Sequence, residues 1–218
     1  MTHSQLRGRF VAFEGGEGAG KSTQAQRLAH TLEQRGYTVE VTREPGGTAG
    51  AEAIRSLLLD PPGDTGWNAQ AEALLFAAAR ADHVANRILP ALESGRWIIC
   101  DRFVDSSRAY QGGAGALGDA AITALHDFGS AGLRPDLTVL ITVDPEQTAQ
   151  RLKLRDGETS DAIGGRSAAY HASVARSFLQ LAQNDPDGFV VIDGNTSPET
   201  VELSIIAALE NHLPELRS

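Results

Sequence analysis

Near its amino end the chain runs Gly15-Gly16-Glu17-Gly18-Ala19-Gly20-Lys21-Ser22, which is a glycine, four residues and then Gly-Lys-Ser. This spacing is typical of a loop that binds phosphate through backbone N–H groups, because glycines let the chain curl around an anion. Residues 9–13 before it suit a buried strand, and apolar residues recur at helical spacing through residues 23–35 after it. Both flanks favour a nucleotide-phosphate site over a glycine-rich turn that binds nothing.

Each part of this motif has a chemical role. The amides at the start of the following helix face an anion, and the positive end of the helix dipole supports it. Lys21 can reach the outer phosphates, and the hydroxyl of Ser22 can bind Mg²⁺. The residues expected to bind ATP are Gly15, Gly16, Glu17, Gly18, Ala19, Gly20, Lys21, Ser22 and Thr23.

The length of 218 residues and the composition are typical of one globular domain. Residues 1–8 are polar and are expected to form a flexible tail. A formal charge of −9 disfavours a nucleic acid polymer as partner, so a nucleotide site has to gather Arg and Lys locally. The single cysteine, Cys100, excludes an internal disulfide and suits the cytoplasm. No apolar run is long enough to cross a membrane, and none resembles a secretion signal.

Strand-like and helix-like patterns alternate to the end of the chain, which predicts an α/β fold with a parallel sheet covered on both faces. The architecture expected is the three-layer α/β/α sandwich of the P-loop NTPases, with five strands. The strands are expected at residues 9–13, 38–42, 96–100, 137–143 and 189–192. The helices are expected at residues 23–35, 48–59, 68–89, 120–128, 145–153, 167–184 and 198–213, the third of them stopped near Pro90.

Ligands of such sheets bind beyond the carboxyl ends of the strands. Asp101 directly follows the apolar run 97–100, so its carboxylate is expected near the phosphate loop, where it can hold Mg²⁺. Arg102 can then clamp a second phosphate. The alternative is that Asp101 caps a helix and Arg102 is a surface charge.

Phe76 and Arg80 are four residues apart in a long helical pattern and therefore share a face. A ring and a guanidinium on one face can hold a nucleotide base, although such residues more often serve as core and surface positions. Residues 106–111 add hydroxyl and amide side chains that can read base edges and sugar hydroxyls, or simply begin a polar helix.

Residues 151–166 have the composition of a mobile lid over a phosphate site. Arg151, Lys153 and Arg155 form a basic cluster, and a glycine-rich stretch follows it. An ordinary surface loop with solvated charges explains these residues equally well.

Taken together, these segments resemble the thymidylate kinase family from Phe10 onward. The phosphate loop is common to many enzymes, but residues 42–48 (TREPGGT), 101–103 (DRF), 109–113 (AYQGG) and 134–138 (RPDLT) are specific in combination. The resemblance implies transfer of the γ-phosphoryl group of ATP to dTMP, giving dTDP and ADP on the way to dTTP. It also implies Mg²⁺ as cofactor, ATP and dTMP as the ligands, and a homodimer.

The resemblance further implies roles for individual residues. Lys21 holds the ATP phosphates, while Ser22 and Asp101 hold the metal. Glu17 approaches the 3′-hydroxyl of dTMP, and Tyr110 packs on the sugar carbon that carries no hydroxyl. The implied substrate-binding residues are Glu17, Arg43, Pro45, Phe76, Arg80, Arg102, Ser107, Tyr110 and Gln111. Among them Phe76 stacks on thymine, Arg80 contacts its carbonyl, and Arg102 holds the dTMP phosphate with Arg43 nearby. The resemblance raises a cis Glu44–Pro45 peptide, whereas base rates strongly favour the trans form, and the sequence does not decide between the two.

The chain departs from the family pattern in the lid. Relatives without an arginine in the phosphate loop carry Asp-Arg-x-Glu there, whereas this chain has Asp161-Ala162-Ile163-Gly164. Arg151, Arg155 or Arg166 could supply the missing charge, and Arg155 is the preferred candidate. The expected catalytic set is therefore Lys21, Asp101, Arg102 and Arg155.

Two other functions compete with this reading. A deoxynucleoside or other nucleoside monophosphate kinase of the same fold would differ in the acceptor pocket around Phe76 and Arg80. A nucleotide-dependent switch protein would need no acceptor pocket at all, and the altered lid favours it slightly. The chain lacks an Asn-Lys-x-Asp guanine motif, which disfavours a GTP switch.

Overall fold

The computed structural model describes residues 7–63, 65–156 and 165–217, except for the side chains of residues 155, 156, 215 and 217. Most of the predicted tail and residues 157–164 of the predicted lid therefore lie outside the described residues. In the described part, no helix is long and apolar enough to cross a membrane.

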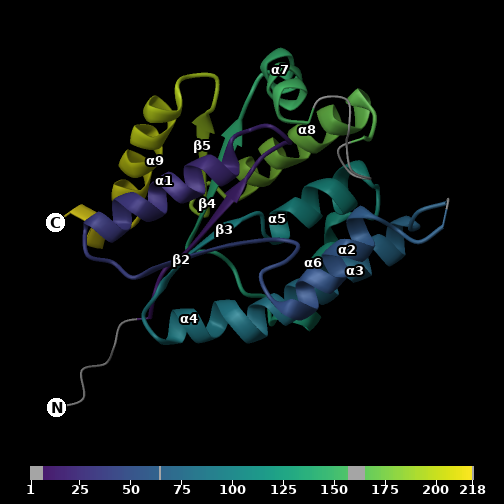
Figure 1. The fold of residues 1–218 in the computed structure, drawn as a ribbon, viewed down its shortest axis with the longest axis horizontal. Helices are drawn as coiled ribbons and strands as arrows, with labels where there is room; N and C mark the ends of the chain where they lie inside the picture. Colours follow the sequence, from purple (N-terminus) through teal and green to yellow (C-terminus); the bar gives the residue numbers. More distant parts are fainter. Residues whose placement is uncertain (1–6, 64, 157–164, 218) are drawn as a thin grey trace.

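Parallel strands form a five-stranded sheet in the order β2-β3-β1-β4-β5, which confirms the predicted fold class (Figure 1). The central strand β1 is buried along its whole length, as its apolar sequence requires. Its Phe13 pairs with Asp101 on one side and with Val139 on the other. The strands are β1 (Phe10–Glu14), β2 (Val39–Arg43), β3 (Trp97–Asp101), β4 (Leu137–Thr142) and β5 (Phe189–Asp193).

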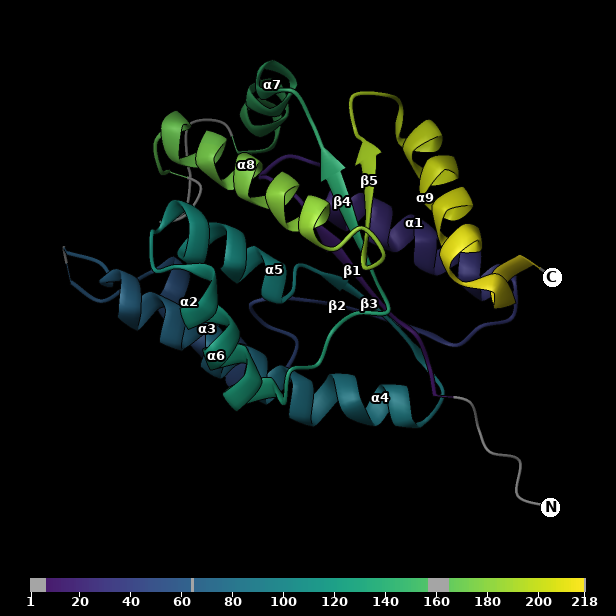
Figure 2. The same ribbon diagram turned by 180° about the vertical axis from the view of Figure 1, so that it is seen from behind.

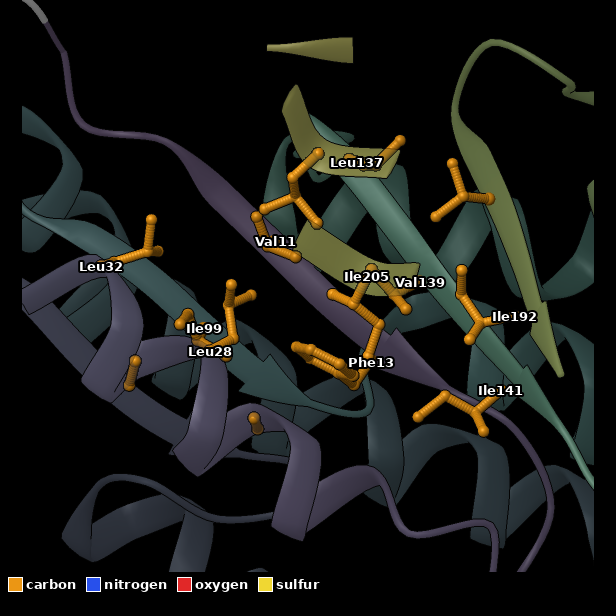
Figure 3. Close-up of a cluster of buried hydrophobic side chains, with 14 of the residues drawn as sticks. Val11, Phe13, Leu28, Leu32, Ile99, Leu137, Val139, Ile141, Ile192 and Ile205 are labelled. Atoms are coloured by element: carbon orange, nitrogen blue, oxygen red, sulfur yellow. The ribbon is translucent and has the colours of Figure 1, made fainter. Parts of the chain in front are cut away.

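Helices cover both faces of the sheet. The α-helices are α1 (Lys21–Gln34), α2 (Ala49–Leu59), α3 (Ala69–His83), α4 (Leu89–Glu93), α5 (Val104–Ser107), α6 (Asp119–Ser130), α7 (Pro145–Asp156), α8 (Ala168–Asn184) and α9 (Pro198–His212). Helices α1 and α9 pack on one face, where Leu28, Leu32 and Ile205 meet Val11 and Phe13 of β1 (Figure 3). Helices α4, α5 and α8 lie on the opposite face (Figure 2). The predicted three-layer sandwich is thereby confirmed.

The predicted helix ends are correct to within a few residues, and side-chain caps explain several of the differences. Thr48, Asn68 and Ser167 lie just outside α2, α3 and α8, and each side chain accepts a hydrogen bond from the backbone N–H three residues later. Pro198 occupies the first turn of α9, as expected.

The prediction that a helix stops near Pro90 is wrong. Helix α3 continues through a π-helical turn, η1 (Val84–Ile88), into α4, which extends to Glu93. Pro90 falls in the first turn of α4, where a backbone N–H is not needed for the helix. A second π-helical turn, η2 (Arg108–Ala114), follows α5, and a 3₁₀ turn, η3 (Pro214–Arg217), ends the described chain.

Candidate active site

A cavity of about 520 Å³ lies at the carboxyl ends of the central strands and contains most of the residues that the sequence indicated. The loops after β1, β2 and β3 form its walls, together with α2, α3, η2 and α7. The predicted site residues that line it are Glu17, Gly18, Gly20, Lys21, Ser22, Thr23, Arg43, Pro45, Phe76, Asp101, Arg102, Ser107, Tyr110 and Gln111. Glu44, Arg55 and Leu59 also line it, although no role was predicted for them. Ser106, which belongs to the 106–111 stretch of predicted polar contacts, lines it as well.

The phosphate loop has the backbone that its glycines allow. Gly15 has a φ of 139°, and a Cβ there would lie 2.3 Å from the carbonyl oxygen of Ile141. Gly20 precedes α1 with a φ of 90°, so α1 begins at Lys21 with its N–H groups toward the cavity. Nζ of Lys21 donates to the carbonyl oxygen of Gly16 at 2.7 Å. Burial, and then the charge of Arg102, lowers the pKa of Lys21 to about 8. A bound anion would raise this pKa again, because it favours the charged ammonium group.

Ser22 and Asp101 meet as predicted, because the hydroxyl of Ser22 donates to Oδ2 of Asp101. The other oxygen, Oδ1, is buried and has no hydrogen-bond partner among the described residues. A hydroxyl and an unsatisfied carboxylate oxygen are hard ligands that suit Mg²⁺. The described residues hold no group of three or more His, Cys, Asp or Glu placed for a metal, so phosphates and water would complete the coordination.

Arg102 is held at the centre of the site. Its backbone has a φ of 72°, and its guanidinium donates to Oε1 of Glu17 at 2.6 Å and to Oγ of Ser106 at 3.0 Å. The guanidinium carbon also lies 5.2 Å from the centre of the Tyr110 ring. Burial acts to lower the pKa of Arg102, but nearby groups led by Tyr110 and Glu17 outweigh it and raise that pKa. The guanidinium is therefore a permanent cation facing the phosphate loop.

Glu14, at the end of β1, is a site residue that the sequence did not reveal. Its Oε1 accepts the N–H groups of Phe103 and Ser106 at 2.8 and 2.9 Å, and its Oε2 accepts the hydroxyl of Ser106 at 2.6 Å. Burial and then the charge of Asp105 raise the pKa of Glu14 to about 7, against the opposing effect of Arg102 and these donors. The carboxyl group of Glu14 thus fixes the turn that presents Arg102.

Phe76 lines the cavity from α3, whereas Arg80, one turn later, is buried with 3% of its area exposed. Nε of Arg80 donates to Oε2 of Glu44 at 2.7 Å, and Nη2 donates to Oγ of Ser107 at 2.8 Å. The other oxygen of Glu44 lies 3.1 Å from Nδ1 of the buried His83. Arg80 therefore lies behind the cavity wall and supports Ser107, and its contact with a base stays a prediction.

The segment after β2 contains a cis Glu44–Pro45 peptide, which is the family-like alternative that the sequence left open. Arg43 forms an ion pair with Glu52 of α2, with Nη2 3.0 and 3.1 Å from the two carboxylate oxygens. Arg55, also on α2, donates to the carbonyl oxygen of Pro45 at 2.8 Å. Helix α2 thus holds this segment against the cavity and adds a cation to it.

The arginines considered for the lid lie in different places. Arg151, on α7, lines the cavity and donates to the carbonyl oxygens of Gly194 at 2.8 Å and Gly18 at 3.4 Å. Arg166 is paired with Glu72 of α3. The side chain of Arg155 and the Asp161–Gly164 stretch lie outside the described residues, so the predicted role of Arg155 stays a prediction.

Comparison with known proteins places the chain in one family. The model of the thymidylate kinase family matches residues 13–205. A thymidylate kinase of Rhizorhabdus wittichii is 54% identical over 95% of this chain and 99% of its own length, and one of Rhodopseudomonas palustris is 48% identical over 96% and 92%. The crystal structure of the Ehrlichia chaffeensis thymidylate kinase superposes with a TM-score of 0.74 at 31% identity, covering 93% of this chain and 99% of that one. The chain belongs to the thymidylate kinase family.

Proposed function

We propose that this protein is a dTMP kinase that transfers the γ-phosphoryl group of ATP to dTMP, giving dTDP and ADP. The observation that carries the proposal is a cavity lined both by the phosphate loop and by Phe76, Tyr110 and Gln111, with Arg102 in contact with Glu17 of the loop and with the Tyr110 ring. A donor polyphosphate on the loop and an acceptor nucleotide on these side chains would therefore share Arg102. The match to the thymidylate kinase family over nearly the whole chain supports the same reaction.

The reaction needs little acid–base chemistry, because the acceptor phosphate is already ionised near neutral pH. The protein instead has to align two phosphates and neutralise the charge on the group in transfer. Lys21 and the loop amides would hold the ATP phosphates, and Arg102 would hold the phosphate of dTMP. Ser22 and Asp101 would hold Mg²⁺, which when bound supplies positive charge to the phosphate oxygens.

The acceptor end of the cavity suits a deoxynucleotide. Phe76 offers a ring for a base to stack on, and Tyr110 offers an apolar surface for a sugar carbon without a hydroxyl. Glu17 is proposed to bind the 3′-hydroxyl, which would make it exchange its present bond with Arg102 for one to the sugar. A ribonucleotide would have to place its 2′-hydroxyl against Tyr110, so we expect discrimination against it.

We also propose a homodimer in the cytoplasm. Phe128 on α6 has 93% of its area exposed, and Leu74 on α3 has 56% exposed. The two helices are neighbours, as Figure 2 shows, so they offer an apolar surface for a second copy of the chain. The single buried Cys100 thiol is compatible with a reducing compartment.

The test is a coupled assay for ADP with ATP, Mg²⁺ and dTMP, repeated with dCMP, UMP and thymidine as acceptors. Of these four acceptors, we expect only dTMP to give rapid ADP release. Faster release with dCMP would favour another monophosphate kinase, and comparable turnover of UMP would refute the discrimination by Tyr110. Tight ATP binding without dTMP-dependent ADP release would favour a switch protein and refute the proposal.

A further inference from the structure

Glu72 lies in the first turn of α3, one helical turn before Phe76, and joins parts of the chain that are distant in sequence. Its Oε1 accepts a hydrogen bond from Nε2 of Gln111 at 2.8 Å, and its Oε2 is paired with the guanidinium of Arg166. Only 13% of the Glu72 side chain is exposed. Both carboxylate oxygens are thus used inside the protein, close to the acceptor end of the cavity.

This bond determines which way the amide of Gln111 faces. A carboxylate can only accept hydrogen bonds, whereas a glutamine amide has one donating and one accepting arm. Glu72 therefore binds the NH₂ arm and leaves the carbonyl arm for other partners. Because Gln111 is buried and lines the cavity, a ligand in the cavity is the partner that this carbonyl oxygen can meet.

The backbone beside Gln111 is held as well. Arg166 donates to the hydroxyl of Tyr170, whose ring centre lies 4.8 Å from the guanidinium carbon. That hydroxyl donates in turn to the carbonyl oxygen of Tyr110 at 2.9 Å. Tyr110 and Gln111 are consecutive in the π-helical turn η2, so this segment is tied through both its main chain and its side chain. The carboxylate of Glu72 thus sets the orientation of the Gln111 amide, while the hydroxyl of Tyr170 holds the main chain beside it.

We propose that Glu72 is a specificity-determining positioning residue, which holds Gln111 so that its carbonyl oxygen accepts a hydrogen bond from the acceptor base. The inference rests on the proposed dTMP kinase function. Thymine has an N–H at ring position 3, whereas cytosine has a bare lone pair there. A carbonyl facing that lone pair leaves two buried acceptors without a hydrogen, which a protein site rejects strongly.

The test replaces Glu72 by glutamine and compares two ligands, dTMP and 5-methyl-dCMP, which share the methyl group, sugar and phosphate. A glutamine at position 72 can pair with Gln111 in either orientation, so the amide is free to turn over and offer its NH₂ arm. The measure of discrimination is the dissociation constant of 5-methyl-dCMP divided by that of dTMP. We expect E72Q to lower this ratio by about tenfold or more. Both constants come from one calorimetric preparation, so any unfolded fraction cancels from the ratio.

The matched control is R166M, which removes the ion pair and leaves the carboxylate of Glu72 on Gln111. We expect its ratio to stay within about threefold of that of the unaltered protein, a small effect on this scale. A fall of less than tenfold in E72Q, or an equal fall in R166M, would overturn the role of Glu72. If the unaltered protein does not bind dTMP, the proposed function fails and this inference fails with it.

Discussion

The buried carboxyl of Glu14 gives the sharpest prediction, because it links stability to pH in a direction opposite to that of an ordinary salt-bridged acid. Its pKa is raised from 4.5 to about 7, first by burial and then by Asp105. In the unfolded chain the group ionises near pH 4.5, whereas in the folded protein it keeps its proton until about pH 7. The stability that Glu14 contributes is therefore fully present below pH 4.5 and is lost as pH rises through 7.

The magnitude follows from the two pKa values. Linkage gives a loss of about 2.5 kcal/mol in the free energy of unfolding between pH 5 and pH 8 from this one group. Glu14→Gln removes the titration but keeps a carbonyl oxygen for the N–H groups of Phe103 and Ser106. The difference in unfolding free energy, variant minus unaltered protein, should therefore rise by about 2.5 kcal/mol over this pH range.

Urea denaturation of the protein without ligands, followed by circular dichroism at half-unit pH steps, measures this difference. Glu93→Gln, which removes an exposed carboxylate from α4, gives the baseline to subtract. A difference that stays flat within about 0.5 kcal/mol, a usual error for such comparisons, would mean that Glu14 titrates alike in both states. A difference that falls with pH would mean that the hydrogen-bond donors lower the pKa of Glu14 by more than burial raises it. Either result would refute the reasoning.

Further predictions concern the charge at the lid and the proposed dimer. If Arg151 supplies the lid charge, Arg151→Ala should lower kcat by roughly 10³-fold or more in the ADP assay, with Arg155→Ala as the matched comparison. Unchanged turnover in Arg155→Ala would eliminate the predicted role of Arg155, and the same result in Arg151→Ala would eliminate that of Arg151. Phe128→Glu should convert a dimer to a monomer in sedimentation experiments without loss of helical signal, and a persistent dimer would contradict the proposed interface.

Local patterns were enough to predict the sheet and the phosphate end of the site. The strands are short apolar runs, so their positions could be predicted, and the rule for strand ends placed Asp101 beside Ser22. The same reasoning failed at Pro90, because a π-helical turn resets the hydrogen-bond pattern before it without any marked change in sequence.

The buried polar pairs lay beyond such patterns because their members are distant in sequence. Arg80 pairs with Glu44, which lies 36 residues earlier, and Arg166 with Glu72, which lies 94 residues earlier. Without Glu44, the position of Arg80 in a helical pattern indicates a solvent-exposed side chain, and without Glu72, Arg166 was considered only as a charge in the lid. A buried charge becomes predictable only when its partner is placed beside it, since desolvation is otherwise too costly.

The ion pairs of the site arginines bear on how an acidic protein can bind nucleotides. A net charge of −9 repels phosphates at long range, so attraction depends on cations gathered at the site. Arg102 is already paired with Glu17, and Arg43 with Glu52, before any phosphate arrives. Binding therefore exchanges one anionic partner for another, and its free energy is a difference rather than the full strength of an ion pair. The carboxylates reduce affinity in this way, but they hold each guanidinium in place, so that a phosphate meets an oriented cation.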